Sequence, residues 1–570
     1  MDNQTFLLIG KPRFPHEASS VPASPGGQLP GAWKEFFDSR NPQAISQVTG
    51  DFAVGYRAPD GRTFLAVDRF AIRSLCYRIV DGVLRFAARA DDLADAETAI
   101  DPQAIYDYLY FHVIPSPRTI FKDVFRLPPG HYALYEKGKL TVSPYWIPEF
   151  SEPATASFAN LKEEFRSLLC NAVKGQLDGS KPACFLSGGT DSSTVSGMVE
   201  KACGQAPASY SIGFEAEGYD EMEYARLAAR HFRTEHHEYY VTPDDLVASI
   251  PMVARHYDQP FGNSSALPAY YCAVMAREDG VSRILAGDGG DELFGGNTRY
   301  AKQKVFGIYD KVPAALRNLL LEPLLLGTPL GRLPLARKGA SYIEQAKVPL
   351  PERSQTYNLL YRLGIDTIFT PDFLAGVDLQ LPDLEQRAIW KMAKTESQTN
   401  RELAFDWRYT LAECDLPKVV GTTELAGIEV GFPMLDQQLV EFSMRLPVHY
   451  KLNGFKLRWF FKEALRGFLP DEILTKKKQG FGLPFGVWTA KHDALKALAE
   501  DSVRGLVDRK ILRADFVDAL FSRYLYEHPG YYGEMIWISM MLEQWFRGQS
   551  ARTAPGSFKS IPRESEPCPI

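Results

Sequence analysis

The sequence predicts an α/β protein with a strand-rich first part and a larger second part built on a parallel sheet. Short apolar strands separated by turn residues occupy the first 150 of the 570 residues. From about residue 160, strands alternate with helical stretches, which is typical of βαβ units. A proline-rich passage separates the strand-rich region from the region of alternating strands and helices, so we expect two domains.

In the first part, turn signals such as Pro59-Asp60-Gly61 separate the predicted elements. Strands are expected at residues 6–9, 52–56, 63–67 and 83–87, and a helix at 101–112. Pro144, Pro148 and Pro153 then predict an extended connector, because each ring fixes φ and removes a backbone donor. We therefore place the first domain at residues 1–155.

The second part opens with a predicted helix at 158–173, where Leu161, Phe165, Leu168 and Leu169 recur at helical spacing. Strands are expected at 183–186, 209–214, 237–240 and 283–286, with helices between them. Residues 300–410 and those from about 435 onward read as mostly helical. We place this domain at 156–548 and expect a flexible tail at 549–570, which is rich in Pro, Ser and charge.

Composition excludes several functions. Lys and Arg number 64 against 70 Asp and Glu, so the net charge is −6 and a nucleic-acid binder is not expected. The seven cysteines form no CxxC pair, which favours a reducing, cytoplasmic compartment. Glu322 and Pro323 interrupt the most apolar stretch, 319–326, which is too short to span a membrane. Oligomeric state stays open, a dimer being possible.

The first strong motif is a Ser/Gly loop between the strand at 183–186 and a helical stretch: Ser187, Gly188, Gly189, Thr190, Asp191, Ser192 and Ser193. Two glycines allow a tight turn whose N–H groups point at one anion, and the helix adds its positive end. The serine hydroxyls can donate to phosphate, and Asp191 offers a hard oxygen to Mg²⁺. No Gly-Lys-Ser/Thr ending follows, so this is not a Walker A loop. The alternative is a turn that only begins a helix.

A second loop, Gly287-Asp288-Gly289-Gly290-Asp291-Glu292, follows the strand at 283–286. Loops at the carboxyl ends of neighbouring parallel strands converge on one crevice. Asp191 and Asp291 would therefore share Mg²⁺ bound to the phosphates of ATP. The alternative is an Asp/Gly-rich surface turn.

These motifs resemble a known family. Residues 187–193 resemble the pyrophosphatase loop of N-type ATP pyrophosphatases, and together with residues 287–296 they resemble the asparagine synthetase family. Further matching pieces follow in family order: Tyr219 to Glu221, Tyr224-Ala225, His236 to Glu238, Leu435-Asp436, Leu439 to Phe442, Lys456 to Arg458, and residues 469–484 with Lys476, Lys478, Gly480 and Phe481. The N-terminal part resembles the family's glutamine-hydrolysing domain at Gly50 to Ala53, Val67 to Arg69 and Leu84 to Ala87. The resemblance implies an Ntn-type αββα domain followed by an ATP-pyrophosphatase domain of the adenine-nucleotide α-hydrolase-like type.

The resemblance also implies a mechanism. A carboxylate is activated with ATP as an acyl-adenylate, pyrophosphate leaves, and ammonia or an amine attacks. Carried over, the phosphate residues are Ser187, Gly188, Gly189, Asp191, Ser192 and Ser193; the adenosine residues are Leu186, Ile212 and Gly287; and the Mg²⁺ ligands are Asp191 and Asp291. Lys478 would neutralise developing charge. Asp288, where relatives carry Glu, would position the amine or accept its proton, or would only support the turn.

Two other features have a structural explanation. Lys477 is expected on a solvated face, in contrast to Lys478. His236-His237 fits no zinc spacing, so a structural role is expected.

Two departures from the family pattern limit the resemblance. Position 2 is Asp where the family uses a nucleophilic Cys, and the next cysteine is the interior Cys76, so glutaminase activity is not expected. Val420-Gly421 replaces the family's Asp-Arg, and Gly431 replaces an Arg, which predicts a larger or less charged acceptor carboxylate than aspartate.

Three hypotheses remain open. The first is an asparagine-synthetase-like ligase that uses ammonia or an amine. The second is a relative of β-lactam synthetases or lasso-peptide cyclases, which close an internal amide. The third is a catalytically silent nucleotide-binding scaffold.

Overall fold

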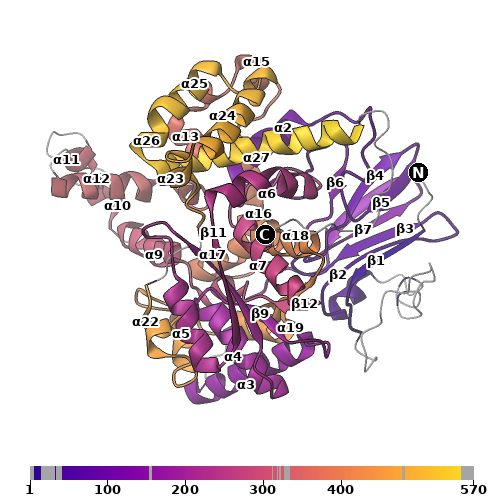
Figure 1. Ribbon diagram of the computed structural model, residues 1–570, viewed down its shortest axis with the longest axis vertical. Helices are drawn as coiled ribbons and strands as arrows, with labels where there is room; N and C mark the ends of the chain where they lie inside the picture. The colour runs from indigo at the N-terminus through magenta and orange to yellow at the C-terminus, as the bar shows by residue number, and fades with distance from the viewer. Residues whose placement is uncertain are drawn as a thin grey trace.

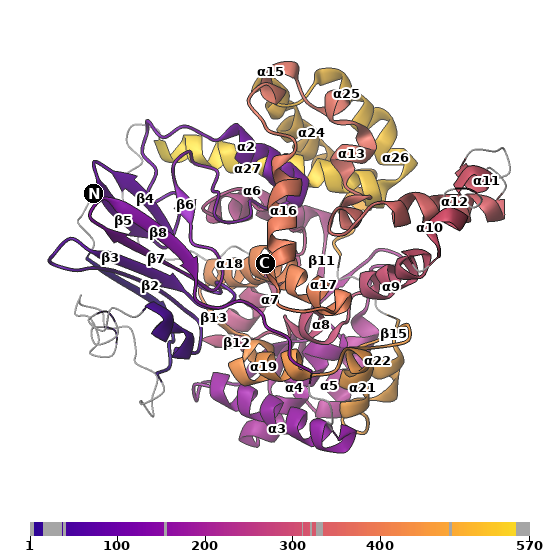
Figure 2. The same cartoon turned by 180° about the vertical axis from the view of Figure 1, so that it is seen from behind.

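The computed structural model describes residues 5–14, 33, 37, 42–152, 157–310, 312–317, 319, 322–326, 334–477 and 482–553. Figures 1 and 2 show an N-terminal part made of strands beside a larger part in which helices surround a central sheet. The predicted α/β class, with a strand-rich first part and a parallel sheet in the second, is confirmed.

The N-terminal part contains two antiparallel sheets. The larger has the order β1-β2-β3-β7-β8: Phe6–Gly10, Phe52–Arg57, Thr63–Val67, His131–Glu136 and Lys139–Pro144. The smaller has the order β5-β4-β6: Val83–Ala87, Cys76–Val80 and Phe125–Arg126. The four predicted strands are confirmed, whereas β4, β6, β7 and β8 were not predicted.

Alternation along the strands explains why this part has two cores. In β2 and β3, Ala53 and Leu65 pack in one cluster with residues of the smaller sheet, while Phe52 and Phe64 pack in another cluster on the opposite face. Successive side chains of a strand point to opposite faces, so both faces of the larger sheet are buried.

The second part contains a parallel sheet of order β11-β10-β9-β12-β13. Its strands are Glu235–Val241, Ala208–Phe214, Ala183–Phe185, Arg283–Leu285 and Glu429–Gly431. The chain leaves β9 through α4 (Thr190–Cys203) to β10, and through α5 (Met222–Phe232) to β11. It then returns to β12 on the other side of β9. Strand order therefore reverses between β9 and β12, and in such sheets the crevice beyond their carboxyl ends is the usual ligand site.

Helices cover both faces of this sheet (Figure 1). Those preceding or flanking the sheet strands are α2 (Pro102–Phe111), α3 (Phe158–Gln176), α6 (Pro243–His256), α7 (Ala266–Glu278) and α8 (Gly290–Phe294). The helices of the middle region are α9 (Thr298–Asp310), α10 (Ala314–Leu316), α11 (Glu322–Leu326), α12 (Pro334–Lys347), η4 (Glu352–Gln355), α13 (Leu359–Leu363), α14 (Ile365–Ile368), α15 (Pro371–Leu374), α16 (Leu381–Met392), α17 (Gln398–Asp406), the π-helical η5 (Trp407–Asp415) and α18 (Leu416–Ala426). Those after β13 include α19 (Gln437–Arg445), α20 (Val448–Lys451), α21 (Trp459–Ala464), α22 (Asp471–Thr475), α23 (Phe485–Thr489), α24 (Asp493–Asp508), α25 (Ala514–Ala519), α26 (Leu525–Glu527) and α27 (Pro529–Thr553).

The long helix α27 packs against both parts of the chain. Tyr108 of α2 donates a hydrogen bond of 2.9 Å to the carbonyl of Ile538, and the Trp537 indole donates one of 2.8 Å to the carbonyl of Gly262. One continuous apolar core therefore includes residues from both parts. Helix α27 runs to Thr553, into the segment expected to be a flexible tail, and residues 554–570 lie outside the described residues.

Candidate functional site

The Ser/Gly loop joins β9 to α4, as predicted. Its serines bond to one another: the Ser187 and Ser192 hydroxyl oxygens are 3.1 Å apart, and the Ser187 N–H donates to Ser192 Oγ at 3.1 Å. These bonds fix the turn before any ligand arrives. Because the first turn of a helix leaves its N–H groups without intrahelical partners, this loop is suited to hold an anion.

The second loop lies directly against the first. A Cβ atom added to Gly287 would stand 2.8 Å from the Ser192 nitrogen, and one added to Gly290 would stand 2.1 Å from Asp191 Oδ1. Any side chain at either position would separate the loops. The glycines after β12 thus serve close approach, which explains their spacing in the sequence.

A buried arginine joins the two loops. Arg458 Nη1 donates to Asp191 Oδ2 and to Asp291 Oδ1, each at 2.8 Å, and Nη2 makes a further bond to Asp191. Arg458 is only 5% exposed. Burial alone would lower its pKa, but the two carboxylates outweigh burial and raise it, so the guanidinium stays charged.

The role of Arg458 was not predicted from the sequence, although it lies in a motif that carries the family resemblance. Its partners are 267 and 167 residues away along the chain, so no local pattern connects them. Asp191 and Asp291 do lie close together, as predicted, and the cation that they share in this structure is the Arg458 guanidinium.

A cavity of about 1120 Å³ opens beside these loops at the switch point; we call it the switch-point cavity. Most of the predicted nucleotide residues line it: Leu186, Ser187, Gly189, Asp191, Ser192, Ile212 and Gly287, together with Asp288 and Asp291. Gly188 and Ser193 do not. Ser193 is fully buried within α4, so its hydroxyl does not face the cavity.

Asp288 faces an ammonium group in this cavity. Lys418 Nζ lies 3.3 Å from Asp288 Oδ1 and 3.4 Å from Asp415 Oδ1. Burial raises the pKa of Asp288, an effect that Lys418 reduces without cancelling it. The same two carboxylates raise the pKa of Lys418, so one cation here serves two acids. Lys418, like Arg458, was not singled out from the sequence.

The three consecutive lysines, 476 to 478, differ in their surroundings. Lys476 Nζ lies 2.8 Å from Glu221 Oε1 and 4.2 Å from the centre of the Tyr224 ring, and the residue lines the cavity. Lys477 is exposed, as predicted, and it also lines the cavity. Lys478, the predicted catalytic lysine, lies outside the described residues, as do Gly480 and Phe481.

The two histidines lie at the opposite edge of the sheet. Both belong to the start of β11, whereas the cavity lies beyond the strand ends. His237 stacks on Tyr210 and groups with Glu235 and Asp279, and Lys181 Nζ already contacts both acids, at 3.1 and 2.5 Å. The group therefore has its own cation.

The departures between residues 418 and 436 do not trim the switch-point cavity. Val420 and Gly421 line a separate space of about 250 Å³ between the two parts, which we call the interdomain cavity. A Cβ at Gly421 would collide with the Tyr257 ring at 2.5 Å, and one at Gly431 would crowd Gln176 and Leu285. Close packing accounts for both glycines. The prediction that these positions shape the acceptor site in the switch-point cavity was therefore wrong.

Comparison with known proteins gives the family. The chain combines an amidotransferase-type sheet domain with a parallel-sheet domain: a glutamine amidotransferase domain model matches residues 35–146, and an asparagine synthase model matches residues 164–547. The second match covers more than half of the chain. The chain belongs to the asparagine synthase family, whose members are ATP-dependent carbon–nitrogen ligases.

Three relatives illustrate the similarity. Glutamine-hydrolyzing asparagine synthetase 1 of Bacillus subtilis (strain 168) is 26% identical over 460 residues, 78% of this chain and 70% of the relative. Putative glutamine-hydrolyzing asparagine synthetase 2 of Methanocaldococcus jannaschii is 35% identical over 221 residues, 38% of this chain and 42% of the relative. Amidase chyE of Penicillium rubens is 24% identical over 522 residues, 78% of this chain and 71% of the relative. Among the described residues, no helix combines the length and apolar character needed to cross a bilayer.

Proposed function

We propose that this enzyme activates a carboxylate with ATP as an acyl-adenylate in the switch-point cavity, releases pyrophosphate, and joins the acyl group to ammonia or an amine. One observation carries the proposal: the loops after β9 and β12 meet at the switch point, with Asp191 and Asp291 bonded to one guanidinium. That arrangement places anion-binding N–H groups beside paired acids in a single cavity.

The binding roles follow from the cavity lining. Ser187, Gly189 and the first turn of α4 hold the phosphates, while Leu186, Ile212 and Gly287 line the space for adenosine. For Gly188 and Ser193 we propose support of the loop from behind, since neither lines the cavity.

The paired acids fit a hard divalent cation. Asp191 and Asp291 offer carboxylate oxygens, the ligands that Mg²⁺ prefers, and one positive group already lies between them. When bound, Mg²⁺ neutralises phosphate charge. Arg458 holds the two acids in place and adds positive charge at the cavity wall, and we assign Lys478 a related role.

Amide formation completes the reaction. The amine nitrogen forms a bond to the acyl carbon, the bond from that carbon to the AMP oxygen breaks, and AMP leaves with the electron pair. The nitrogen gives up a proton, which Asp288 is placed to accept because burial raises its pKa toward that of a useful base. Lys418 orients the Asp288 carboxylate.

We propose that the N-terminal domain, residues 1–155, does not hydrolyse glutamine. Cys76 is the first cysteine of the sequence. It is fully buried in β4, and burial raises the pKa of its thiol, so it forms no reactive thiolate. Asp2 lies outside the described residues. The domain boundary near residue 155 and the synthetase domain at 156–548 remain part of this proposal.

A pyrophosphate-release screen tests the proposal. Purified protein receives ATP, Mg²⁺, candidate carboxylates and ammonia or amines; one carboxylate should give pyrophosphate and AMP. Asp191→Ala and Lys478→Ala should each lower the rate by at least about 100-fold, a loss typical of a preorganised electrostatic group. Asp372→Ala, a change on the remote helix α15, is the matched control and should leave the rate unchanged. Formation of ADP in place of AMP would contradict the mechanism, and release of glutamate from glutamine would contradict the inactive N-terminal domain.

A further inference from the structure

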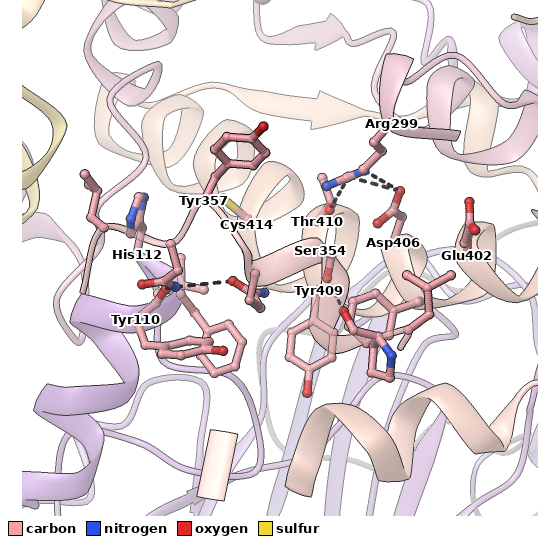
Figure 3. A pocket seen from close by; sticks show the side chains of 18 of the residues that line it. Tyr110, His112, Arg299, Ser354, Tyr357, Glu402, Asp406, Tyr409, Thr410 and Cys414 are labelled. Atoms are coloured by element: carbon pink, nitrogen blue, oxygen red, sulfur yellow. Dashed lines mark hydrogen bonds and ion pairs between the residues drawn. The ribbon is translucent and has the colours of Figure 1, made fainter. Parts of the chain in front are cut away.

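A second cavity, of about 510 Å³, lies between the N-terminal part and the synthetase part; we call it the side pocket (Figure 3). Its walls come from the end of α2, from α9, from the segment near residue 354, from α17 and η5, and from the start of α27. None of the residues assigned above to nucleotide binding lines it.

One stripe of side chains connects the side pocket to the switch-point cavity. Glu402, Asp406, Thr410 and Cys414 recur at intervals of four residues along α17 and η5, and all four line the side pocket. Thr410 also lines the switch-point cavity. The two spaces therefore adjoin at Thr410, where Arg299 Nη2 donates to the threonine hydroxyl at 2.9 Å and Arg299 Nε donates to Asp406 at 3.0 Å (Figure 3).

The pocket combines aromatic walls with acidic groups. Tyr110, Tyr300, Tyr357, Trp390, Phe405 and Tyr409 supply rings. Aromatic faces and carboxylates together recognise an organic ammonium group. The pocket is therefore built for a positively charged ligand with an apolar body, not for free aspartate.

Glu402 is the acid best placed to bind that charge. It is 7% exposed, and its Oε1 accepts a hydrogen bond of 2.8 Å from the Gln398 amide. Among the ion pairs of the described residues, Asp406 has Arg299 and Glu534 has His112, but Glu402 has no cation within ion-pair distance. Burial raises the pKa of Glu402 to about 8, which favours its neutral form; an ammonium group bound beside it would lower that pKa and stabilise the charged carboxylate.

Distance sets the length of the ligand. Eight residues separate Glu402 from Thr410, which at no more than about 1.5 Å per residue, the α-helical rise, is up to about 12 Å along the axis of α17 and the π-helical η5. An ammonium group at Glu402 is therefore too far from the switch-point cavity to be the attacking nitrogen. A chain of about three extended residues spans this distance.

We propose that the side pocket binds the ammonium-bearing, aromatic end of a short peptide or peptide-like amino acid, whose carboxylate extends past Thr410 into the switch-point cavity. This inference rests on the proposed function, because it names the class of carboxylate that is activated there. It also gives the N-terminal domain a use without glutamine hydrolysis, since Tyr110 and His112 at the end of α2 form part of the pocket wall.

The test is a binding measurement that needs neither ATP nor turnover. Calorimetry with the full chain compares phenylalanyl-glycyl-glycine with its N-acetyl derivative, in which a neutral acetamide replaces the ammonium group. The free peptide should bind at least about 10-fold more tightly, the size of one well-placed charged hydrogen bond.

Two variants locate the effect. Glu402→Gln should remove most of the difference between the peptides, whereas Glu385→Gln, on the same helix as Trp390 but outside the pocket, should preserve it. Equal binding of the two peptides to the unaltered protein would overturn the proposal even if Glu402→Gln failed to fold. An undiminished preference in a folded Glu402→Gln protein would overturn it as well. The binding measurement contains no ATP, so its outcome is independent of the pyrophosphate-release screen. Peptide binding with no pyrophosphate release in that screen would refute the proposed function alone. Pyrophosphate release without peptide binding would refute only the side-pocket assignment.

Discussion

Two charge clusters of opposite balance lie in this molecule. In the switch-point cavity, one guanidinium, Arg458, holds two carboxylates. At the contact between the two parts, one carboxylate, Glu413, is held by two guanidinium groups: Arg126 at 2.8 Å and Arg408. Glu413 also accepts hydrogen bonds from the Ser116 amide and hydroxyl.

The two clusters differ in how far their carboxylates are exposed. Asp191 and Asp291 keep about a fifth of their side chains exposed, at 19% and 21%, and face a large cavity. Glu413 is 3% exposed and fully surrounded by protein donors. We infer that the first cluster is arranged to accept a ligand and the second to hold the two parts together.

Replacing Arg458 should have the largest effect. Arg458→Met would remove the buried guanidinium that bonds to both carboxylates, which should lower stability by about 3 kcal/mol and pyrophosphate release by at least about 100-fold. Thermal melting and the pyrophosphate assay measure the two losses. Arg445→Met is the matched control, because its pair with Glu164 is exposed and should contribute less than about 1 kcal/mol. Equal destabilisation by both changes would show that the buried pairs of Arg458 stabilise the protein no more than the exposed pair of Arg445.

Replacing Glu413 should affect stability more than chemistry. Burial alone would raise the pKa of Glu413, but Arg408 and Arg126 outweigh it and lower the pKa below the usual 4.5. The stabilisation is therefore present above the unfolded value and is lost as the pH falls through the folded one.

We expect Glu413→Gln to cost about 2 kcal/mol at neutral pH, the size of hydrogen bonds to a charged group. The gap between its melting midpoint and that of the unaltered protein should shrink below about pH 4, near the pKa of a free Glu. A gap that stayed constant from neutral to acidic pH would show that charge is not what Glu413 contributes.

The smallest effect should separate two adjacent lysines. Lys476→Met removes the cation beside Glu221 and Tyr224 at the cavity wall, so the KM for ATP should rise about 5-fold, roughly 1 kcal/mol. Lys477→Ala should change the KM less, because Lys477, although it also lines the cavity, is exposed to solvent. Steady-state kinetics with varied ATP measures both, and identical behaviour of the two variants would refute the assignment of Lys476 to the cavity.

The sequence predicted the local features well because they are written in adjacent residues. The turn after β9 and the glycines after β12 follow apolar strands directly, and parallel-sheet topology brings such loops together without further information. The hairpin of β7 and β8 was missed although Lys137-Gly138, both with positive φ, form its turn; the polar residues at the strand ends hid the alternation. β13 is only three residues long and ends in Gly431, too little for any periodic signal.

Ion pairs between distant segments of the chain could not be predicted from the sequence. Arg458, Lys418 and Glu413 acquire their roles only from residues brought near by folding. A charged side chain that pairs across more than a hundred positions leaves no spacing to detect. Two predicted residues do not line the cavity. Ser193 lies on the buried side of the first turn of α4, and Gly188 lies in the loop before the helix, packed against Tyr224 and Ala225.

The η5 turn gives three consecutive residues three different surroundings. Glu413 lines the interdomain cavity, Cys414 the side pocket and Asp415 the switch-point cavity. Deleting or inserting one residue before them would rotate each side chain by about a quarter of a turn, so every one of them would face its neighbour's compartment. A single substitution in this segment changes the lining of one cavity. A change in the length of the segment would alter the lining of all three cavities at once.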